Sequence, residues 1–301
     1  MSAVFDFHIH SRYSSDGFYS PEEIYSMAYS AGLKYFAITD HNEVKGSAYL
    51  FEKFKGNSGL YLIPGIEIST WYKSEEIHVL AYGIDYNSVQ LLQCLDEYRK
   101  NIPTHIALRC EALRKAGFYI DDDDLFNESK GMKPSTVSIL NVMKKNPKND
   151  KVLYDYFYGS RSSSPYMNFY LDYNAYGKKA YVDFPLLDFN KVVETMKDEC
   201  FLSIAHPMHY SDSILEELFI DGIRGLEIYS SYKSKKPVEY YQNLALKYNL
   251  TATGGSDFHG ESLKPGINIG DVSAKESVLE NFLEKLHKYA PNPIVQLDTV
   301  G

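Results

Sequence analysis

A short apolar segment at residues 5–10, with the sequence FDFHIH, most constrains what this chain can fold into. Side chains of a β-strand alternate between its two faces, so a strand here places His8 and His10 on one face and apolar residues on the other. Two imidazoles about 7 Å apart on one face can bind one metal ion or two neighbouring ions. Asp16 follows in a loop of Ser, Asp and Gly that can fold back over the strand end. A His-x-His pair alone also fits ordinary polar residues, so this interpretation depends on the rest of the chain.

The composition is that of a globular protein with an acidic balance. At 301 residues, 44% of them hydrophobic, the chain is long enough to bury a full core. The net charge of −9 argues against a polymeric nucleic acid or a membrane as partner, although a local cluster of cations can still bind a small anion. No apolar run reaches the length of about 18 residues that spans a membrane, and the N-terminus has no signal-peptide pattern. We expect a cytoplasmic protein whose three cysteines are reduced and buried, and nothing in the sequence specifies its oligomeric state.

Strands and helices alternate in both outer thirds of the chain. Seven strands of one kind are predicted, at residues 5–10, 35–39, 60–66, 76–81, 201–205, 223–229 and 250–254. Between them the pattern is helical, with helices predicted at Val89–Lys100, His105–Ala116, Thr136–Lys144 and Lys151–Phe157. Alternating strands and helices, with polar residues after the strands, are typical of a parallel α/β sheet or barrel.

Nine residues that can bind a metal lie on or just beyond the predicted C-terminal ends of strands. They are His8, His10, Asp16, His41, Glu67, His78, His206, Asp257 and His259. Strand ends converge at one face of an α/β barrel, so we expect these side chains to meet there. Six imidazoles and three carboxylates suit Mn, Fe or Zn rather than Ca, and they are too many for one ion. The sequence therefore predicts two or three divalent metal ions.

Charge balance then indicates the kind of substrate. Three carboxylates supply −3, and three divalent ions would supply +6, which leaves about +3 for hydroxide and an anion. A phosphate dianion fits this balance, because bridging metal ions can activate a shared water and hold phosphoryl oxygens for in-line attack.

Six motifs carry a family resemblance. HIH…SDG, ITDH, GIEIS, IHVLAY, AHP and GGSDFH occur in this order over about residues 1–85 and 180–270. Together they resemble the PHP (polymerase and histidinol phosphatase) family, in particular its stand-alone TrpH/YciV-like metal-dependent phosphoesterases. The resemblance implies a distorted (β/α)7 barrel, TIM-like and α/β in class, formed by residues 1–86 and 178–301. Residues 87–177 would form a helical insertion subdomain.

The resemblance also implies how the metal ligands are shared. His8, His10, Glu67 and Asp257 would surround one ion, Glu67, His78 and His206 a second, and Asp16, His41 and His259 the third. Four of them, Asp16, His41, His206 and His259, are the candidate catalytic residues. Asp40 would orient an imidazole from outside the ligand set.

The chain departs from the family pattern at three points. Asp16 follows His10 by six residues where relatives often have five, with Ser15 as the extra residue. Lys133-Pro134-Ser135 stands where relatives have Arg-x-His, and a lysine keeps the charge without the bidentate fork. Ala-His-Pro-x-Arg ends here in His209. The candidate phosphate contacts are Lys133, Arg161, Lys179 and His209, with Arg12 as a further cation.

Several other residues have a plain structural interpretation. We expect His105 and His287 on the surface, Trp71 in packing, and Glu227 in a structural role rather than as a ligand. Gly254-Gly255 is expected to let two backbones approach beneath the site, because no Gly-rich nucleotide loop follows.

The predicted function is metal-dependent hydrolysis of a small phosphomonoester by a metal-bridging hydroxide. A nucleotide, either a 5′-nucleotide or a 3′,5′-bisphosphate, is the favoured substrate, and a phosphodiesterase step stays open. Histidinol phosphate or another non-nucleotide monoester is the alternative with the same site. An amidohydrolase is disfavoured, because no strand end carries a bridging lysine, and a non-catalytic PHP module is disfavoured because all nine ligands are present.

Overall fold

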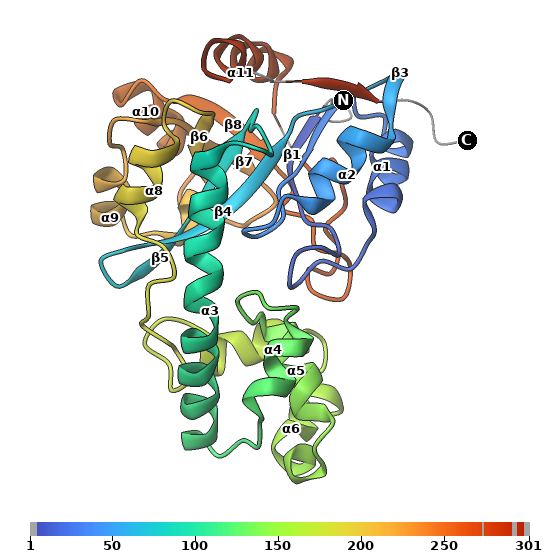
Figure 1. Ribbon diagram of the computed structural model, residues 1–301, viewed down its shortest axis with the longest axis vertical. Helices are drawn as coiled ribbons and strands as arrows, with labels where there is room; N and C mark the ends of the chain where they lie inside the picture. The colour runs from blue at the N-terminus through green and yellow to red at the C-terminus, as the bar shows by residue number, and fades with distance from the viewer. Residues whose placement is uncertain (1–4, 273, 291–293, 298–301) are drawn as a thin grey trace.

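The computed structural model describes residues 5–272, 274–290 and 294–297 of the chain. Figure 1 shows a part that contains the β-strands and, below it, an all-helical part that is reached through the long helix α3 (Val89–Lys115). Within the described ranges no helix is both long and apolar enough to cross a membrane.

The strands form two sheets. One has the order β1 (Phe5–Ile9), β2 (Tyr35–Ile38), β3 (Lys55–Leu62) and β9 (Val295–Leu297). The other has the order β4 (Gly65–Tyr72), β5 (Glu75–Tyr82), β6 (Phe201–Ile204), β7 (Ile223–Ser230) and β8 (Thr251–Gly255). Isolated parallel bridges, Ile9 to Phe258 and His41 to Glu67, link the two sheets. The predicted α/β class is confirmed. A closed seven-stranded barrel is not, because the hydrogen-bonded strand pairs form two separate sheets.

The sequence predicted a parallel sheet or barrel, but the strands are not all parallel. β1 to β3 and β6 to β8 are parallel, whereas β5 runs antiparallel to both β4 and β6. The single strand predicted at 60–66 is divided between β3 and β4. A connection of two or three residues suffices for an antiparallel neighbour but cannot cross over to a parallel one, so β4 and β5 form a hairpin.

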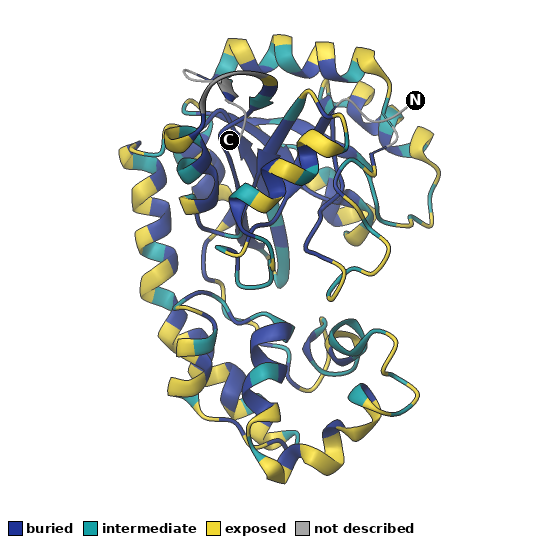
Figure 2. Ribbon diagram, turned by 90° about the vertical axis from the view of Figure 1, so that its right-hand side faces the viewer, coloured by how far each residue is buried: buried dark blue, intermediate teal, exposed yellow. Residues whose placement is uncertain are grey.

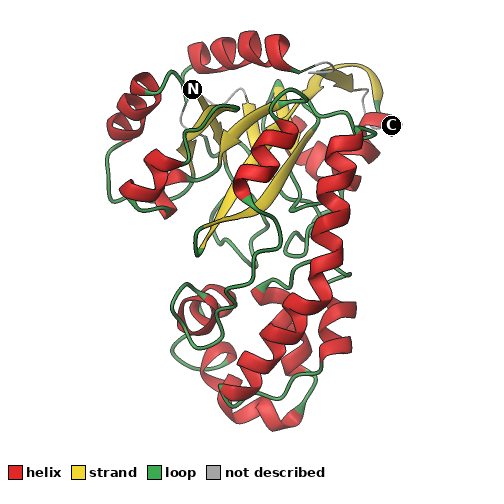
Figure 3. Ribbon diagram, turned by 60° about the vertical axis from the view of Figure 1, so that its left-hand side comes forward, coloured by secondary structure: helices red, strands yellow, loops and turns green. Residues whose placement is uncertain are grey.

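Helices pack around the sheets, as Figure 3 shows. They are α1 (Pro21–Ser30), α2 (Lys45–Lys53), α8 (Phe189–Met196), α9 (Asp212–Glu217), α10 (Val238–Lys247) and α11 (Glu276–Tyr289), with the 3₁₀ turn η3 (Pro207–His209). The helix α1 begins with a capping box, in which Ser20 and Glu23 satisfy each other's backbone N–H groups.

The helical part contains α4 (Asp122–Glu128), α5 (Thr136–Lys144), α6 (Asp150–Phe157) and α7 (Pro165–Phe169), with the short turns η1 (Pro147–Asn149) and η2 (Tyr170–Asn174). The prediction of two helices at 89–100 and 105–116 is wrong, since α3 continues through Pro103. An internal proline costs roughly 3 kcal/mol. Tyr98, Ile102 and Ile106 are buried on both sides of it, and this packing offsets the loss.

One hydrophobic core runs from the sheets into the insertion. Ile66, Leu95, Leu140 and Phe169 belong to the same cluster of buried residues, although they come from β4, α3, α5 and α7. Figure 2 shows the buried strands and the buried inner faces of the insertion helices. The insertion therefore shares its core with the sheets, and the boundaries at 86/87 and 177/178 stay a prediction.

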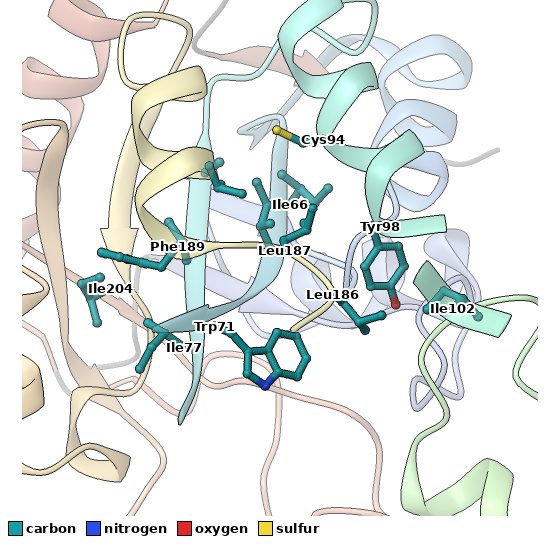
Figure 4. Packing of buried hydrophobic residues seen from close by; sticks show 14 of the residues in the cluster. Ile66, Trp71, Ile77, Cys94, Tyr98, Ile102, Leu186, Leu187, Phe189 and Ile204 are labelled. Carbon is teal, nitrogen blue, oxygen red and sulfur yellow. The ribbon is translucent and has the colours of Figure 1, made fainter. Parts of the chain in front are cut away.

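Figure 4 shows where β4 meets α3. Trp71 lies beside Leu186, in the same cluster as Tyr98 and Ile102, and is buried, in agreement with the predicted packing role. His105 is fully buried, so its predicted surface position is wrong: α3 turns this face toward the rings of Trp71 and Phe184.

Two smaller predictions about surface and core are confirmed. His287 is exposed on α11. Cys94, Cys110 and Cys200 are free and buried.

Candidate metal centre

The structure brings the nine predicted ligands to one end of the sheets. His8 lies in β1, His10 lies just after it, and Asp16 lies in the loop that follows. His41 follows β2, Glu67 lies in β4, and His78 lies in β5. His206 follows β6, and Asp257 and His259 follow β8. Groups of three or four of their ligand atoms lie within 4.8 Å of one another, and His206 contacts these groups.

The position of His78 differs from the prediction. It lies in the first half of β5, not at the end of a strand, and it pairs with Ser69 of β4. Because β5 runs opposite to β4, the first half of β5 lies where the His78 side chain can reach Glu67. His78 therefore lies near the other ligands, as predicted, but an antiparallel hairpin places it there and not the end of a parallel strand.

The first group consists of His8, His10, Glu67 and Asp257, all of them buried. The Nε2 atoms of His8 and His10 lie 3.2 and 3.1 Å from Glu67 Oε2. The same two nitrogens lie 3.3 and 3.1 Å from Asp257 Oδ1. Two imidazoles and two carboxylates thus face a common point, which is a donor set for a divalent ion.

Glu67 also belongs to a second group. Its Oε2 lies 3.0 Å from His41 Nδ1, and its Oε1 lies 2.9 Å from His78 Nδ1. His206 Nε2 lies 3.2 Å from Glu67 Oε1 and 3.2 Å from His78 Nδ1. The carboxylate therefore faces imidazoles from several strands and has the geometry to bridge two ions.

The third group is His10, Asp16, His41 and His259. Asp16 Oδ2 lies 3.7 Å from His41 Nε2 and 3.5 Å from His259 Nε2, while the rings of His10 and His259 stack. The sets implied by the resemblance are thus close together in space. The structure adds His10 to the third set and His41 to the second.

Unpaired atoms test whether these residues fit bound cations. Glu67 Oε2, Asp257 Oδ1 and His41 Nδ1 are buried and make no hydrogen bond of good geometry. Buried polar atoms in native proteins are normally satisfied, and lone pairs that converge on one point are satisfied by a cation. The donor set therefore fits divalent ions.

The charges of the groups agree with this fit. Burial disfavours an ionised Glu67, yet the imidazoles of His41, His8 and His78 hold its pKa well below the usual value. Burial also opposes a charged His8, but the carboxylates of Asp257, Glu227 and Glu67 raise its pKa well above the ordinary one. Without cations, protons must compensate the carboxylates, and divalent ions would replace them.

A layer of residues outside the ligand set holds it in place. Glu227 accepts a hydrogen bond from His8 Nδ1 at 2.9 Å and another from the backbone N–H of His206 at 2.7 Å. This agrees with the structural role predicted for Glu227. Asp40 does not orient an imidazole as predicted: it accepts hydrogen bonds from Ser11 N at 2.6 Å and Ser11 Oγ at 2.7 Å, and burial raises its pKa to about 7.

Sequence reasoning missed three residues around the site. Tyr232 and Lys264 both contact Asp257 Oδ2, and the Tyr210 hydroxyl accepts a hydrogen bond from His78 N at 3.0 Å. No motif contains them. Their signal in the sequence is their position in loops that follow β6, β7 and β8.

The predicted phosphate contacts lie in different surroundings. Lys133 forms an ion pair with Glu76, which in turn contacts His78 Nε2 at 3.1 Å. The His209 ring lies 4.8 Å from that of His206 and 4.4 Å from that of Tyr232.

The other two candidates have no contact with the nine residues in the described part of the chain. Arg161 pairs with Asp155 and Asp172 of the insertion. Lys179 is exposed in a turn.

A cavity with three cationic side chains is lined partly by the loops that carry metal ligands. It has a volume of about 280 Å³ and is lined by Arg12, Tyr13, Glu43, Lys45, Lys130 and Met132. Arg12 follows His10 by two residues, and Lys45 follows His41 by four. The cavity therefore lies between two ligand-bearing loops and the insertion.

Known proteins share this sequence and fold. The PHP domain model matches residues 6–251. A 5′–3′ exoribonuclease of Haemophilus influenzae is 27% identical, with 94% of this chain and 100% of that protein covered. A 3′,5′-nucleoside bisphosphate phosphatase of Chromobacterium violaceum is 24% identical, with 92% and 93% covered. The structure of an amidohydrolase from Chromobacterium violaceum with bound sulfate superimposes with a TM-score of 0.76 at 21% identity, with 98% of each chain covered.

These matches bear on the expectations from the sequence. The structural likeness shows the shared fold, and the exoribonuclease relative leaves the expected absence of a polymeric nucleic-acid partner unconfirmed. The family model covers most of the chain and includes seven of the nine candidate ligands, from His8 to His206. Asp257 and His259, in the last motif, lie beyond it. The chain therefore belongs to the PHP domain family, and it is a metal-dependent phosphoesterase of that family.

Proposed function

We propose that this protein hydrolyses a phosphate ester of a small nucleotide, either a 5′-nucleotide or a nucleoside 3′,5′-bisphosphate. One observation carries the proposal: three carboxylates, two of them buried, and six imidazoles from widely separated segments converge on common points. Divalent Mn, Fe or Zn ions held there would neutralise phosphate oxygens and make a water molecule acidic enough to attack phosphorus.

The exposure of the ligands indicates the side from which substrate enters. The side chains of His8, His10 and Glu67 are at most 1% exposed, whereas those of Asp16 and His41 are 14% and 17% exposed. The buried ligands form the floor of the site. Asp16 and His41, with His206 and His259 beside them, are therefore our candidates for the catalytic face.

Two further residues would contact the reacting phosphate. Lys133 reaches the edge of the site through Glu76 and carries a positive charge toward it. Burial lowers the pKa of His209 to about 3, so its ring is neutral and can donate one hydrogen bond to an ester oxygen. Arg161 and Lys179 drop out of the proposal because of their other partners and exposure.

The cationic cavity supports a substrate with a second anionic group. Arg12, Lys45 and Lys130 line it, opposed by the single carboxylate of Glu43. A nucleoside bisphosphate that placed one phosphate at the metal centre could direct the other toward these cations. The bisphosphatase named above is a relative over almost the whole chain, which agrees with this choice.

The scaffold we infer for this site is a distorted barrel. The ladders β1–β2 and β4 to β8, if the Ile9–Phe258 and His41–Glu67 bridges are counted as links, would make a ring of seven strands. Both bridges lie next to ligand residues. The gaps in the ladder would then occur where the metal centre widens the ring.

A second candidate function is stepwise hydrolysis of RNA from a 5′ end. It is favoured by the exoribonuclease relative, which this chain matches over its full length, and by cations that could hold a following phosphodiester. Histidinol phosphate and other non-nucleotide monoesters use the same metal chemistry, so only a comparison of substrates separates them.

The test is metal analysis of the purified protein together with a substrate panel. The panel contains nucleoside 3′,5′-bisphosphates, 5′-nucleotides, histidinol phosphate and short 5′-phosphorylated RNA. We expect two or three ions per chain and the highest kcat/KM for phosphate release from a bisphosphate. Release of mononucleotides from RNA at a higher rate would establish the second candidate instead.

Matched variants show whether the site does the chemistry. His206→Ala and Asp257→Asn should lose metal and activity, whereas His287→Ala and Glu239→Gln, at exposed positions, should lose neither. Unchanged metal content in both site variants would contradict the assignment.

A further inference from the structure

The loop that carries Asp16 is held by the insertion as well as by the sheets. Ser135 Oγ donates a hydrogen bond to the backbone carbonyl of Ser15 at 3.0 Å, and Ser138 Oγ lies 3.4 Å from the same carbonyl. Lys130 Nζ donates to the carbonyl of Arg12 at 2.6 Å. These contacts join the start of α5 and the segment before it to the loop at 11–17.

The opposite side of this loop is fixed to the sheet part of the molecule. Ser14 Oγ donates to Asp16 Oδ1 at 2.7 Å, and the same hydroxyl accepts a hydrogen bond from His41 N at 3.3 Å. A Cβ at Gly17 would lie only 1.9 Å from the carbonyl oxygen of Ser11, so the loop is closely packed on itself. With one side fixed, the position of Ser15 sets the direction of the Asp16 carboxylate.

The contact joins two segments at which the sequence departs from the pattern that the family resemblance implies. By that resemblance Ser15 is the additional residue between His10 and Asp16, and Ser135 stands at the end of the Lys133-Pro134-Ser135 segment. Ser135 also caps α5, because its Oγ accepts a hydrogen bond from Ser138 N at 3.2 Å. The helix therefore holds the donor hydroxyl in place, and Ser138, at 2% exposure, is equally fixed.

Asp16 is weakly held by its ligand partners. Its Oδ2 lies 3.5 and 3.7 Å from the nitrogens of His259 and His41, whereas Glu67 and Asp257 lie 2.9–3.3 Å from theirs. A carboxylate on a loop needs support from outside its own ligand group to keep its direction. The serines of the insertion provide that support.

We propose that Ser135 and Ser138 are positioning residues that direct Asp16 into the ligand group of His10, His41 and His259. The insertion then controls the affinity of this one ion, while the group at His8 and Glu67 does not depend on the insertion. The inference rests on the proposed metal centre and adds to it a part of the chain far from the strands.

The test compares metal binding by three kinds of variant. Ser135→Gly with Ser138→Ala removes both hydroxyls, and glycine is itself a favoured N-cap residue, so α5 keeps its start. Ser135→Thr keeps the hydroxyl. Asp16→Asn marks the loss of the ion itself, and Ser162→Ala with Ser163→Ala, at exposed insertion positions, is the matched control.

The measurements are equilibrium dialysis against Mn²⁺ with elemental analysis and hydrogen exchange of the loop 11–17. Asp16→Asn should bind one ion fewer than the unaltered protein. The Gly/Ala double variant should bind the same ion 10–100-fold more weakly, the range found when the outer partner of a ligand is removed. Its loop amides should exchange faster, and Ser135→Thr and the Ser162/Ser163 variant should match the unaltered protein.

The outcomes separate this inference from the proposed function. If Asp16→Asn loses an ion and the double variant binds Mn²⁺ as the unaltered protein does, the inference is wrong and the metal centre stands. If the Ser162/Ser163 variant loses the ion too, the effect is a general one of the insertion and the inference is also wrong. If Asp16→Asn loses no ion, the assignment of Asp16 fails, and the inference fails with it.

Discussion

Glu67 is the carboxylate on which most of the imidazoles of the metal centre converge. Nitrogens of five histidines, His8, His10, His41, His78 and His206, lie within 3.2 Å of its two carboxylate oxygens. A single buried carboxylate can face so many imidazoles only if cations or protons balance the charge. The residue is therefore both the most informative one in the site and the one least able to be replaced.

Glu227 offers a test of the layer outside the ligands. Glu227→Gln replaces one acceptor oxygen by a donor, so the side chain can no longer accept from both His8 Nδ1 and His206 N. Metal affinity should fall 10–100-fold, measured by calorimetric titration with Mn²⁺. Glu239→Gln, at an exposed position of α10, is the control, and equal affinities for the two variants would contradict the role given to Glu227.

His105 makes stability depend on pH. Burial lowers its pKa to about 3, so it stays neutral in the folded chain while the unfolded chain binds a proton below pH 6.5. The pKa is depressed on folding, so stability is lost as pH falls through the window from 6.5 to about 3. Between pH 7.5 and 5.5 this single group should lower the free energy of unfolding by about 1.4 kcal/mol.

His105→Phe removes this contribution, because phenylalanine fills the space without a titrating group. Urea unfolding at the two pH values should show a smaller loss of stability for the variant than for the unaltered protein. Subtracting the loss of unfolding free energy in the variant from the loss in the unaltered protein also cancels the contributions of other histidines with lowered pKa values, such as His41 and His209. Identical pH dependence in both proteins would show that His105 is protonated in the folded state.

At the scale of elements, strand position was predictable and strand direction was not. Alternating apolar residues in Glu75–Tyr82 identify β5, but the same pattern fits a parallel or an antiparallel strand. The connection Lys73–Ser74 contains no Gly or Asn that would mark a tight hairpin, although Lys73 adopts a φ of 56°. The nine ligands could be named because each follows or lies in a strand, whereas the contacts of Lys264 and Asp40 arise from loop folding.

The close approach of β8 to β1 was predictable from two glycines. A Cβ at Gly255 would lie 2.2 Å from His8 Cβ and 2.5 Å from His8 N, which confirms the predicted backbone approach beneath the site. Gly255→Ala should therefore lower the free energy of unfolding by about 2–3 kcal/mol and displace His8. Gly177→Asn is the control, because nothing lies within 4 Å of its added Cβ and asparagine tolerates its φ of +73°.

Thermal unfolding of both variants measures this effect, and Mn²⁺ titration reports the position of His8. Equal melting temperatures for Gly255→Ala and Gly177→Asn would show that β1 and β8 can separate without loss of stability.

At the scale of the whole molecule, bound ions should stabilise the fold. The ligands come from both sheets and from the loop at Asp16, so an ion links segments that are far apart in sequence. A ligand at 100 times its Kd stabilises by about 2.7 kcal/mol. Removal of metal by a chelator should lower Tm by several degrees, and Mn²⁺ or Zn²⁺ should restore it, as followed by calorimetry.

The Asp257→Asn variant supplies the control for that measurement, since its Tm should respond less to the chelator. If the unaltered protein melts at the same temperature with and without the chelator, then either no ion was bound or the ions contribute nothing to the fold.

The span of the ligands along the chain also has a consequence for synthesis. His8 leaves the ribosome early, whereas Asp257 and His259 follow about 250 residues later, and β1 meets β8 only then. Between these moments the nascent chain carries exposed imidazoles that have no complete partner set. The first and third ligand groups can be completed only near the end of translation, because they need Asp257 and His259, so any shortened product that stops before β8 would leave the ribosome without these two groups.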